Sequence, residues 1–268
     1  MVSWLDRFLT RLRGEPARSR RREATPFRVP DGLRVYAIGD VHGHADLLDR
    51  MAELVADDLR RDPPREARAV FVGDYIDRGP DTAGVIERLV TRRFPVPFET
   101  LRGNHEDLMM RALDAPEPSV ADAMEDWCGN GGLETIRSYG VEVEKARHGK
   151  GLRKLRTEFL RSFPEAHRAF LDATALSLRI GGYFFAHAGA RPEVPLDRQD
   201  PEDLMWIRDA CYGSDFDFGV VLVHGHTPHK RPEDLPRRIN VDTGAFKWGV
   251  LSAAVLEGGT RRFLSTRD

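Results

Sequence analysis

The sequence predicts a mixed α/β fold whose β-sheets contain both parallel and antiparallel strands. Three features of the 268 residues indicate it: short apolar runs rich in β-formers, amphipathic stretches between the early runs, and glycine turns that join the late runs. Strands separated by helices pair in parallel, whereas hairpin strands pair antiparallel, so both kinds of pairing are expected. A chain of this length can bury a full core, and we expect one large domain.

The first half of the chain alternates strands with helices. The helices place apolar residues on one face, as Leu47, Leu48, Met51 and Val55 do in the first of them. In order, the expected elements are a strand at Leu33–Ile38, a helix at Ala45–Asp58, a strand at Ala69–Val72, a helix at Asp81–Arg92, a strand at Val96–Leu101 and a helix at His105–Leu113.

A helical insert is expected next, over about residues 107–175, where it would stand above the strand ends. Its helical patterns lie at Ala121–Trp127, Leu133–Tyr139, Leu152–Arg161 and Glu165–Ala173. Inside the insert, Asn130-Gly131-Gly132 has the composition of an ordinary turn.

The second half of the chain is richer in strands. Leu176–Ile180 and Tyr183–Ala186 are expected to form a hairpin through the two-residue turn Gly181-Gly182. Later strands are expected at Val220–Val223, Arg238–Val241, Val250–Leu256 and Arg261–Leu264.

The first residues of the chain form a basic arm. Seven arginines against three acidic residues give the segment 1–23 a charge of +4, which leaves −6 for the rest of a chain whose net charge is −2. Its apolar residues share one helical stripe: Trp4, Leu5, Phe8, Leu9 and Leu12. We expect an arm and linker over 1–28, before the main domain at 29–268. The arm is either a loosely packed extension or a contact for a membrane surface or a partner protein.

The amino-acid composition limits the classes of partner and the cellular compartments to be expected. The small net charge gives no general attraction to nucleic acid, so no nucleic-acid partner is expected. The two cysteines, Cys128 and Cys211, stand in no metal-binding or redox spacing, which favours a reducing compartment and predicts a cytoplasmic protein. No apolar run approaches the roughly 20 residues of a membrane span.

Five apolar runs each end in a small cluster of Asp, Asn or His bordered by glycine. The clusters are Gly39-Asp40-Val41-His42-Gly43, Gly73-Asp74-Tyr75-Ile76-Asp77-Arg78-Gly79, Gly103-Asn104-His105-Glu106, His187-Ala188-Gly189 and His224-Gly225-His226-Thr227. Asp40 and His42 are two residues apart, so in extended backbone they share a face and can meet one metal ion. Since ligands in α/β folds bind beyond the carboxyl ends of strands, we expect the clusters to converge on one site.

These blocks, in this order, resemble the signature of the metallophosphoesterase superfamily, and more narrowly its phosphoprotein phosphatase (serine/threonine phosphatase) branch with its bacterial and phage members. The blocks run from Asp40 to Thr227, which is most of the chain. The resemblance implies a calcineurin-like β-sandwich of two mixed sheets flanked by helices. Asn130-Gly131-Gly132 is also similar to a block of the bacterial members, beside its reading as an ordinary turn.

A two-metal centre fits the ligand types, and matching each residue to the family's motif gives the same assignment. Two close divalent ions need a carboxylate to bridge them, and Asp74 is the candidate. The first metal would take Asp40 and His42, and the second would take Asn104, His187 and His226. Carboxylate, amide and imidazole ligands without a thiolate suit manganese, with iron or zinc as alternatives.

Four further residues are candidates for catalysis. His105 would protonate the leaving oxygen, and Asp77 would hold its imidazole. Arg78 would bind the phosphate, and Arg208 is either a second phosphate ligand or part of a surface salt bridge. The expected reaction is direct attack of a metal-bridging hydroxide on phosphorus, without a phosphoenzyme. Asp242 could orient one of the histidine ligands from behind.

The expected function is therefore a metal-dependent phosphomonoesterase, in the first place a serine/threonine protein phosphatase. The alternative is a dinucleoside polyphosphate (diadenosine tetraphosphate) hydrolase or another small-molecule phosphatase, so the expected partner is a phosphoprotein or a small phosphorylated substrate. A catalytically inactive binding module would have lost a ligand or the proton donor, and every one of these positions is filled here.

Overall fold

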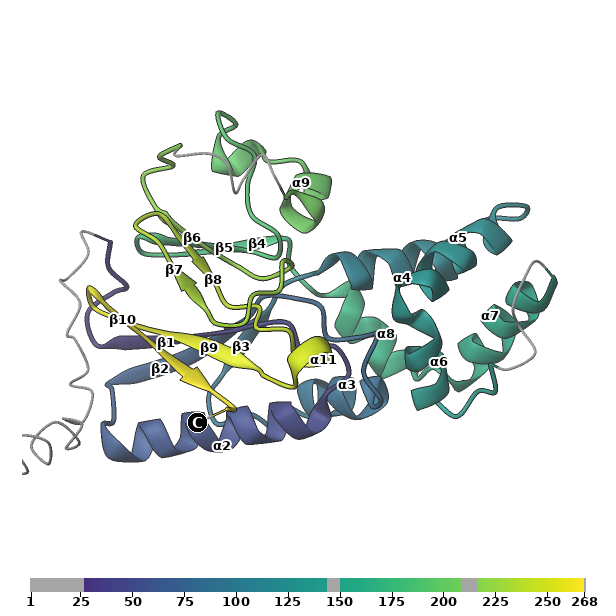
Figure 1. The fold of residues 1–268 in the computed structure, drawn as a ribbon, viewed down its shortest axis with the longest axis horizontal. Helices are drawn as coiled ribbons and strands as arrows, with labels where there is room; N and C mark the ends of the chain where they lie inside the picture. The colour runs from purple at the N-terminus through teal and green to yellow at the C-terminus, as the bar shows by residue number, and fades with distance from the viewer. Residues whose placement is uncertain (1–26, 144–149, 209–215, 268) are drawn as a thin grey trace, which may run out of the picture.

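The computed structural model describes residues 27–143, 150–208 and 216–267. Within this part the chain folds as two five-stranded mixed sheets with helices around them, which confirms the predicted fold class (Figure 1). The apolar stripe of the basic arm lies outside the described residues, so the arm, its boundary and its partners stay predictions.

The first sheet has the strand order β10-β9-β1-β2-β3. Its centre is parallel: β1 (Leu33–Ile38), β2 (Glu66–Phe71) and β3 (Phe98–Thr100) run in the same direction. The hairpin of β9 (Ser252–Glu257) and β10 (Thr260–Ser265) adds two antiparallel strands beside β1. The parallel strands carry the first three polar clusters at their carboxyl ends.

The second sheet has the strand order β4-β5-β6-β8-β7. The predicted hairpin is present as β4 (Ser177–Ile180) and β5 (Tyr183–Ala186). The parallel strands β5, β6 (Val221–His224) and β8 (Arg238–Asn240) follow, and the short β7 (Glu233–Asp234) closes the edge. The last two polar clusters follow β5 and β6.

A dry core between the two sheets holds the strand ends in place. Side chains alternate along β1: Val35 and Ala37 face Val223 of the second sheet, whereas Tyr36 and Ile38 face the helices. All five are fully buried, and burial of a Val or Ile side chain contributes about 1.5–3 kcal/mol. The turns that follow these strands therefore start from rigid positions.

Helices cover the outer faces of both sheets. The helices α2 (Ala45–Arg61) and α3 (Thr82–Val90) pack on the first sheet, and α9 (Pro201–Trp206) packs on the second. The sequence prediction missed α9, although Asp200 accepts a hydrogen bond at its start and proline stands at its first position, a usual helix beginning. The short α11 (Ala245–Trp248) lies between β8 and β9 in the chain and was also missed.

The helices predicted for the insert are present and lie together at one end of the molecule (Figure 1). They pack on the same core as α2 and α3, with Trp127 and Phe159 among its buried members. The segments from β3 to β4 are α4 (Asn104–Asp114), α5 (Val120–Trp127), the π-helix η1 (Cys128–Gly132), α6 (Leu133–Ser138), α7 (Lys150–Ser162) and α8 (Glu165–Asp172).

A buried arginine joins α2 to the first sheet. The Arg34 guanidinium, fully buried, contacts Glu257 at 2.7 Å, Asp62 at 2.9 Å and Asp58 at 3.1 Å. Tyr36 donates its hydroxyl hydrogen to Asp58 at 2.7 Å. Burial acts to raise the pKa of Asp58, but hydrogen bonds from Arg262 and Tyr36 and the nearby arginine charges outweigh it, so the pKa lies below its usual value.

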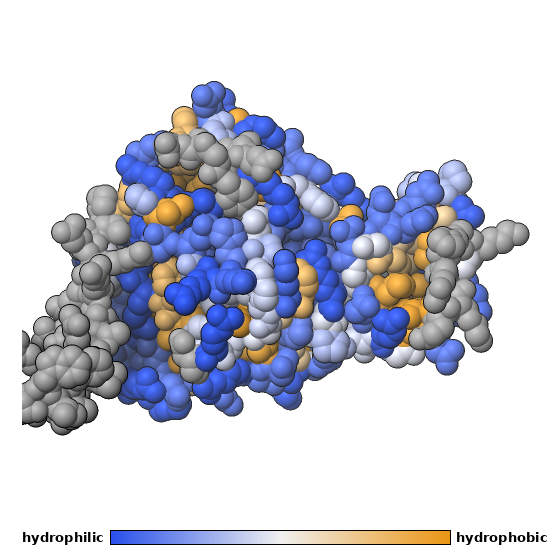
Figure 2. All heavy atoms as spheres, in the orientation of Figure 1, coloured by the Kyte–Doolittle hydropathy of each residue, from blue (hydrophilic) through white to orange (hydrophobic). Residues whose placement is uncertain are grey.

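The described surface gives no sign of a bilayer-spanning segment. Within residues 27–143, 150–208 and 216–267, no helix combines the length and the apolar character that crossing a membrane requires. Figure 2 shows that the face drawn in Figure 1 is mostly hydrophilic, with smaller hydrophobic areas between the charged side chains.

Candidate metal and catalytic site

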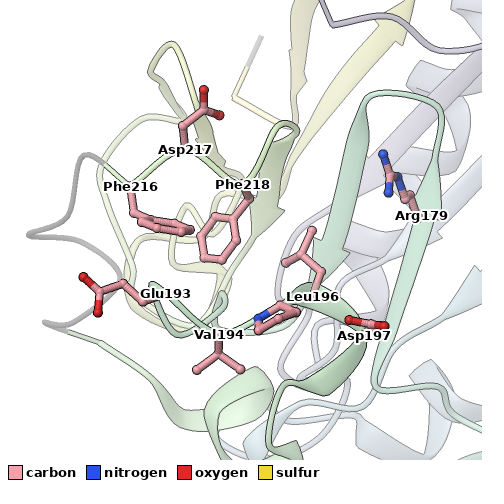
Figure 3. A pocket seen from close by; sticks show the side chains of 9 residues that line it. Arg179, Glu193, Val194, Leu196, Asp197, Phe216, Asp217 and Phe218 are labelled. Carbon is pink, nitrogen blue, oxygen red and sulfur yellow. The ribbon is translucent and has the colours of Figure 1, made fainter.

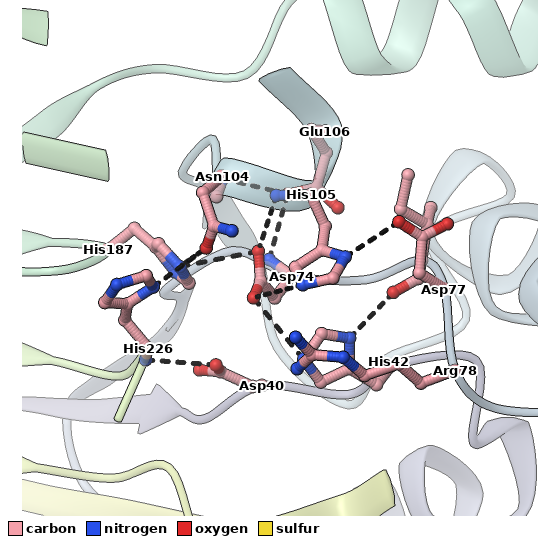
Figure 4. A network of polar contacts seen from close by, with 12 residues as sticks. Asp40, His42, Asp74, Asp77, Arg78, Asn104, His105, Glu106, His187 and His226 are labelled. Carbon is pink, nitrogen blue, oxygen red and sulfur yellow. Dashed lines mark hydrogen bonds and ion pairs between the residues drawn. The ribbon is translucent and has the colours of Figure 1, made fainter. Parts of the chain in front are cut away.

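The polar clusters of the two sheets meet around Asp74 (Figure 4). The six predicted metal ligands are all at most 5% exposed, and each comes from the turn after a strand or from the start of α4. They are Asp40 and His42 after β1, Asp74 after β2, Asn104 after β3, His187 after β5 and His226 after β6. The structure thus brings together residues that are up to 186 positions apart.

The turns that present these side chains have an unusual backbone. Five non-glycine residues of the site are left-handed, with φ of 44° at His42, 53° at Asp74, 70° at Asp77, 69° at Arg78 and 68° at His226. Such a conformation costs about 1–2 kcal/mol per residue and persists only where the surroundings enforce it. Here the turns bind one another: the N–H of His42 donates to the carbonyl of Asp74 at 2.9 Å.

On one side of Asp74, three ligand atoms face one another. Asn104 Oδ1 lies 2.9 Å from His187 Nε2 and 2.8 Å from His226 Nδ1, and Asp74 Oδ1 lies 3.4 Å from His187 Nε2. The carbonyl of Val72 can only accept, so His187 Nδ1, at 3.0 Å from it, must carry the ring hydrogen. Burial lowers the pKa of both histidines, so the rings are neutral and His187 turns a lone pair toward the oxygens. Lone pairs that face oxygens at this distance suit a cation.

On the other side of Asp74, the same arrangement recurs. His42 Nδ1 lies 2.8 Å from the carbonyl of Ile76, which leaves the Nε2 lone pair 3.4 Å from Asp74 Oδ2. Arg78 donates to that lone pair at 2.9 Å. Asp40 Oδ1 is buried without a hydrogen-bond partner in the described residues. Its other carboxylate oxygen, Oδ2, accepts a hydrogen bond from the backbone N–H of His226 at 3.0 Å.

The charges of the site also call for cations. Burial, followed by the charges of Asp242 and Asp74, raises the pKa of Asp40 well above its usual value. Burial and the charge of Asp74 raise the pKa of Asp242 to about 7. Asp242 contacts Asp40 and accepts from the N–H of Gly244 at 2.9 Å, so the idea that it orients a histidine ligand is not what the structure shows. Three buried carboxylates beside neutral imidazoles fit a pair of divalent cations.

His105 points into the site next to the ligands without the same surroundings. Its Nδ1 lies 2.7 Å from Asp77 Oδ2, and its Nε2 is buried, without a hydrogen-bond partner in the described residues, 3.9 Å from Asp74 Oδ2. Burial acts to lower the pKa of His105, because it disfavours the charged ring. The negative charge of Asp74 and the hydrogen bond with Asp77 outweigh this effect, so the pKa of His105 is raised. Nδ1 of His105 thus faces Asp77, and Nε2 is the ring nitrogen that faces the centre of the site, where a proton donor is needed.

The two predicted arginines lie at the edge of the site. The Arg78 guanidinium lies 4.4 Å above the ring of Phe246, which in turn contacts His42 with 5.1 Å between ring centres. Arg208 is exposed and donates to the hydroxyl of Thr227 at 3.0 Å, so it stands beside the residue that follows the last ligand. Phe246 was not anticipated, because a single aromatic on a short helix has no distinctive pattern.

Glu106 is a site residue to which the sequence prediction gave no role. Its carboxylate accepts from the N–H groups of Asp74 at 2.9 Å, Tyr75 at 2.8 Å and Gly103 at 2.8 Å. Burial and the charge of Asp74 raise the pKa of Glu106 to about 7, whereas these backbone donors act in the opposite direction. Glu106 stands three residues after Gly103, the position from which a Glu side chain accepts the N–H of the residue that precedes a helix, and this spacing could have identified it.

A second hollow lies away from this centre. It has a volume of about 520 Å³ and is lined by Leu196, Phe216 and Phe218, with Arg179 and Asp197 at its edge (Figure 3). Its lining contains none of the predicted ligands or catalytic residues. The candidate metal ligands and catalytic residues therefore lie at the strand ends and not in this hollow.

Comparison with known proteins agrees with this geometry. The sequence profile of the calcineurin-like phosphoesterases matches residues 33–248. Serine/threonine-protein phosphatase 1 of Salmonella typhimurium is 36% identical over 237 residues, which are 83% of this chain and 92% of that protein. The asymmetrical bis(5'-nucleosyl)-tetraphosphatase PrpE of Halalkalibacterium halodurans is 30% identical over 230 residues, 81% of this chain and 87% of that protein. A crystal structure of a protein assigned provisionally as a diadenosine tetraphosphatase superimposes with a TM-score of 0.57 at 21% identity, covering 87% and 93% of the two chains, and shows the same fold.

Proposed function

The chain belongs to the calcineurin-like phosphoesterase family, and from this premise we propose that it is a serine/threonine protein phosphatase. It is a metal-dependent hydrolase of phosphate esters. The observation that carries the narrower proposal is the placement of Arg78 and His105 on one side of Asp74. A terminal phosphate is a dianion that benefits from an arginine fork, and a serine leaving group needs a proton. The higher identity to the Salmonella protein phosphatase also supports it.

We assign the metal ligands as the donor set suggests. Asp40, His42 and Asp74 would hold one cation, and Asp74 would share the second with the remaining three residues. Those three are Asn104, His187 and His226. When bound, divalent cations neutralise phosphoryl charge and lower the pKa of water to near neutral. Oxygen and imidazole donors without a thiolate favour manganese over iron or zinc as the metal that we propose.

Four residues of the chain would bind the phosphate, donate the proton to the leaving group and position that proton donor. Arg78 binds phosphoryl oxygens, because its guanidinium lies beside His42 and is steadied by the Phe246 ring. His105 gives the proton on Nε2 to the leaving oxygen. Asp77 holds Nδ1 and so fixes which nitrogen faces the substrate. Arg208 contributes a second cationic group at the rim. We place the enzyme in the cytoplasm, because its two cysteines stand in no metal-binding or redox spacing.

A second candidate function is hydrolysis of dinucleoside polyphosphates. The 30% identity to the PrpE tetraphosphatase favours it, since the same centre can act on a different phosphate compound through a different entrance.

A comparison of substrates tests the proposal. The manganese-loaded protein is assayed with a panel of phosphoserine and phosphothreonine peptides and with diadenosine tetraphosphate, and kcat/KM is compared. We expect the peptides to be preferred by at least about tenfold, which corresponds to 1.4 kcal/mol in transition-state binding. Asp74→Asn serves as the control, since it removes the carboxylate that the two cations would share. A higher kcat/KM for diadenosine tetraphosphate would replace the proposal with the second candidate.

A further inference from the structure

We propose that the helical insert is part of the catalytic apparatus: Trp127 and Thr135 are positioning residues that fix Asp77 and, through it, the proton donor His105. This inference rests on the proposed phosphatase function and deepens it. Besides shaping the entrance of the catalytic site, the insert contacts Asp77 directly and so positions the proton donor.

The Asp77 carboxylate accepts hydrogen bonds from three side chains that belong to three different segments. Trp127 Nε1 lies 3.1 Å from both of its oxygens, the Thr135 hydroxyl donates to Oδ1 at 2.6 Å, and His105 Nδ1 contacts Oδ2 at 2.7 Å. Asp77, Trp127 and Thr135 are fully buried and His105 is 1% exposed. Since protein groups supply these contacts in a dry environment, the carboxylate has one orientation to offer the imidazole.

Thr135 also holds the backbone of the residue that it orients. The N–H of Asp77 donates to Thr135 Oγ1 at 2.9 Å, while the hydroxyl hydrogen goes to the carboxylate of the same residue. Thr82 Oγ1 lies 3.1 Å from Thr135 Oγ1 and completes the cluster. Asp77 has a φ of 70°, and this double contact is one of the forces that keep it left-handed.

The glycines between Trp127 and Thr135 make this approach sterically feasible. The carbonyl of Gly131 accepts from the N–H of Arg78 at 3.2 Å, and a Cβ on Gly131, whose φ is 105°, would collide with Arg78. A Cβ on Gly132 would collide with the Trp127 indole. The segment Asn130-Gly131-Gly132 is thus more than a turn, because it seats the indole and supports the backbone of the phosphate-binding arginine.

Trp127 also packs on Phe159, with ring centres 5.5 Å apart, so a plain core role is the competing explanation. The two roles differ in what they predict for the chemistry. A core residue changes stability, whereas a residue that positions a proton donor changes how strongly the rate depends on the leaving group.

The experiment measures kcat for a series of aryl phosphates, from 2,4-dinitrophenyl to phenyl phosphate, with the manganese-loaded full chain. The variants are Thr135→Val, which keeps the packing volume but removes the hydroxyl donor, and Trp127→Phe, which removes the indole donor and leaves a smaller ring. We expect kcat on phenyl phosphate to fall roughly 10- to 100-fold, part of the 10²- to 10⁴-fold that a general acid contributes. The loss on 2,4-dinitrophenyl phosphate, whose leaving group needs no proton, should be under about threefold.

Three controls separate positioning from folding. Thr135→Ser keeps the hydroxyl and should restore most of the turnover that Thr135→Val loses on phenyl phosphate. Ile136→Val alters the next buried residue of α6 and should lower stability without changing the leaving-group dependence. In a His105→Asn background, Thr135→Val should add little, because the two residues act in one chain of contacts.

Two results would overturn the inference. One is a leaving-group dependence in Thr135→Val and Trp127→Phe equal to that of the wild type, and the other is full additivity with His105→Asn. If either insert variant does not fold, as judged by circular dichroism, the other carries the test with the same outcomes. A wild type inactive on every aryl phosphate would refute the proposed function itself, which distinguishes the two failures.

Discussion

At the scale of single residues, one glycine sets how closely the two sheets approach within the site. Gly225 lies against the Asp40 carboxylate, and a methyl group on its Cα would overlap that carboxylate. Its N–H donates to the carbonyl of His187 at 2.8 Å, which ties the turn after β6 to the turn after β5. A larger residue here must push away the Asp40 carboxylate, which we propose as a metal ligand.

We therefore expect Gly225→Ala to disturb metal binding more than folding. Displacing the carboxylate of Asp40 should reduce the manganese bound per chain and lower turnover by roughly 10²-fold, the usual effect of a 1 Å misplacement. Metal analysis after gel filtration measures the first effect. Gly129→Ala is the matched control, since the space around Gly129 is open. Equal metal content in the two variants would contradict this expectation.

The residues that could be predicted from sequence are those that follow a strand directly. Asp40, Asn104 and His226 each stand at such a point, and the parallel order of the strands brings them to one edge. Trp127 and Thr135 could not be predicted as partners of the site, because they lie on helices of the insert and follow no strand, and helical periodicity does not say which side chain a buried donor contacts. Nothing in the local sequence records which buried donor meets which carboxylate.

At the scale of elements, the attachment of α2 to the first sheet depends on charge as well as on its apolar face. Asp58 near the end of α2 accepts from Arg34, Tyr36 and Arg262, and its pKa is lowered as a result. The amphipathic pattern made the helix and the face that it buries predictable. The contacts of the buried Arg34 were not predictable, since Arg34 lies in a β-strand and the residues next to it in sequence do not indicate that it pairs with α2.

Asp58→Asn should lower the free energy of unfolding by about 1–3 kcal/mol at pH 7. A carboxylate whose pKa is lower in the folded chain stabilises it above the usual carboxyl pKa, and this contribution disappears as the pH falls through the folded value. The difference between wild type and variant in urea unfolding should therefore shrink between pH 7 and pH 3. Asp57→Asn, at a surface pair with Arg60, should change stability by less than about 0.5 kcal/mol. A difference that stays constant with pH would refute the role assigned to the Asp58 charge.

At the scale of the whole molecule, the site is where the two sheets are coupled. The first sheet presents Asp40, His42 and Asp74, and the second presents His187 and His226. The mixed sheets were predictable from the switch between helix-separated strands and hairpins. The packing of the insert onto the common core was not, because helical periodicity fixes the buried face of a helix and leaves its partner open.

Manganese should consequently stabilise the entire fold. A ligand that binds only the folded chain adds about 2.7 kcal/mol at a concentration of 100 times its Kd, which for a chain of this size raises Tm by roughly 5–10 °C. Asp74→Asn should abolish most of the rise, since this carboxylate lies between both ligand groups. Differential scanning calorimetry with and without manganese, with reversal by a chelator, checks it. An equal rise in the variant would mean that the ion binds elsewhere.

The division of ligands between the sheets has a consequence for synthesis on the ribosome. A nascent chain that has emerged only as far as Asn104 already displays the amino-terminal ligands, yet it lacks the imidazoles of His187 and His226 that complete the cage. Such a chain should be unable to dephosphorylate anything. Catalytic competence then arrives only after the second sheet has been synthesised, so shorter products of an interrupted ribosome remain inert toward cellular phosphates.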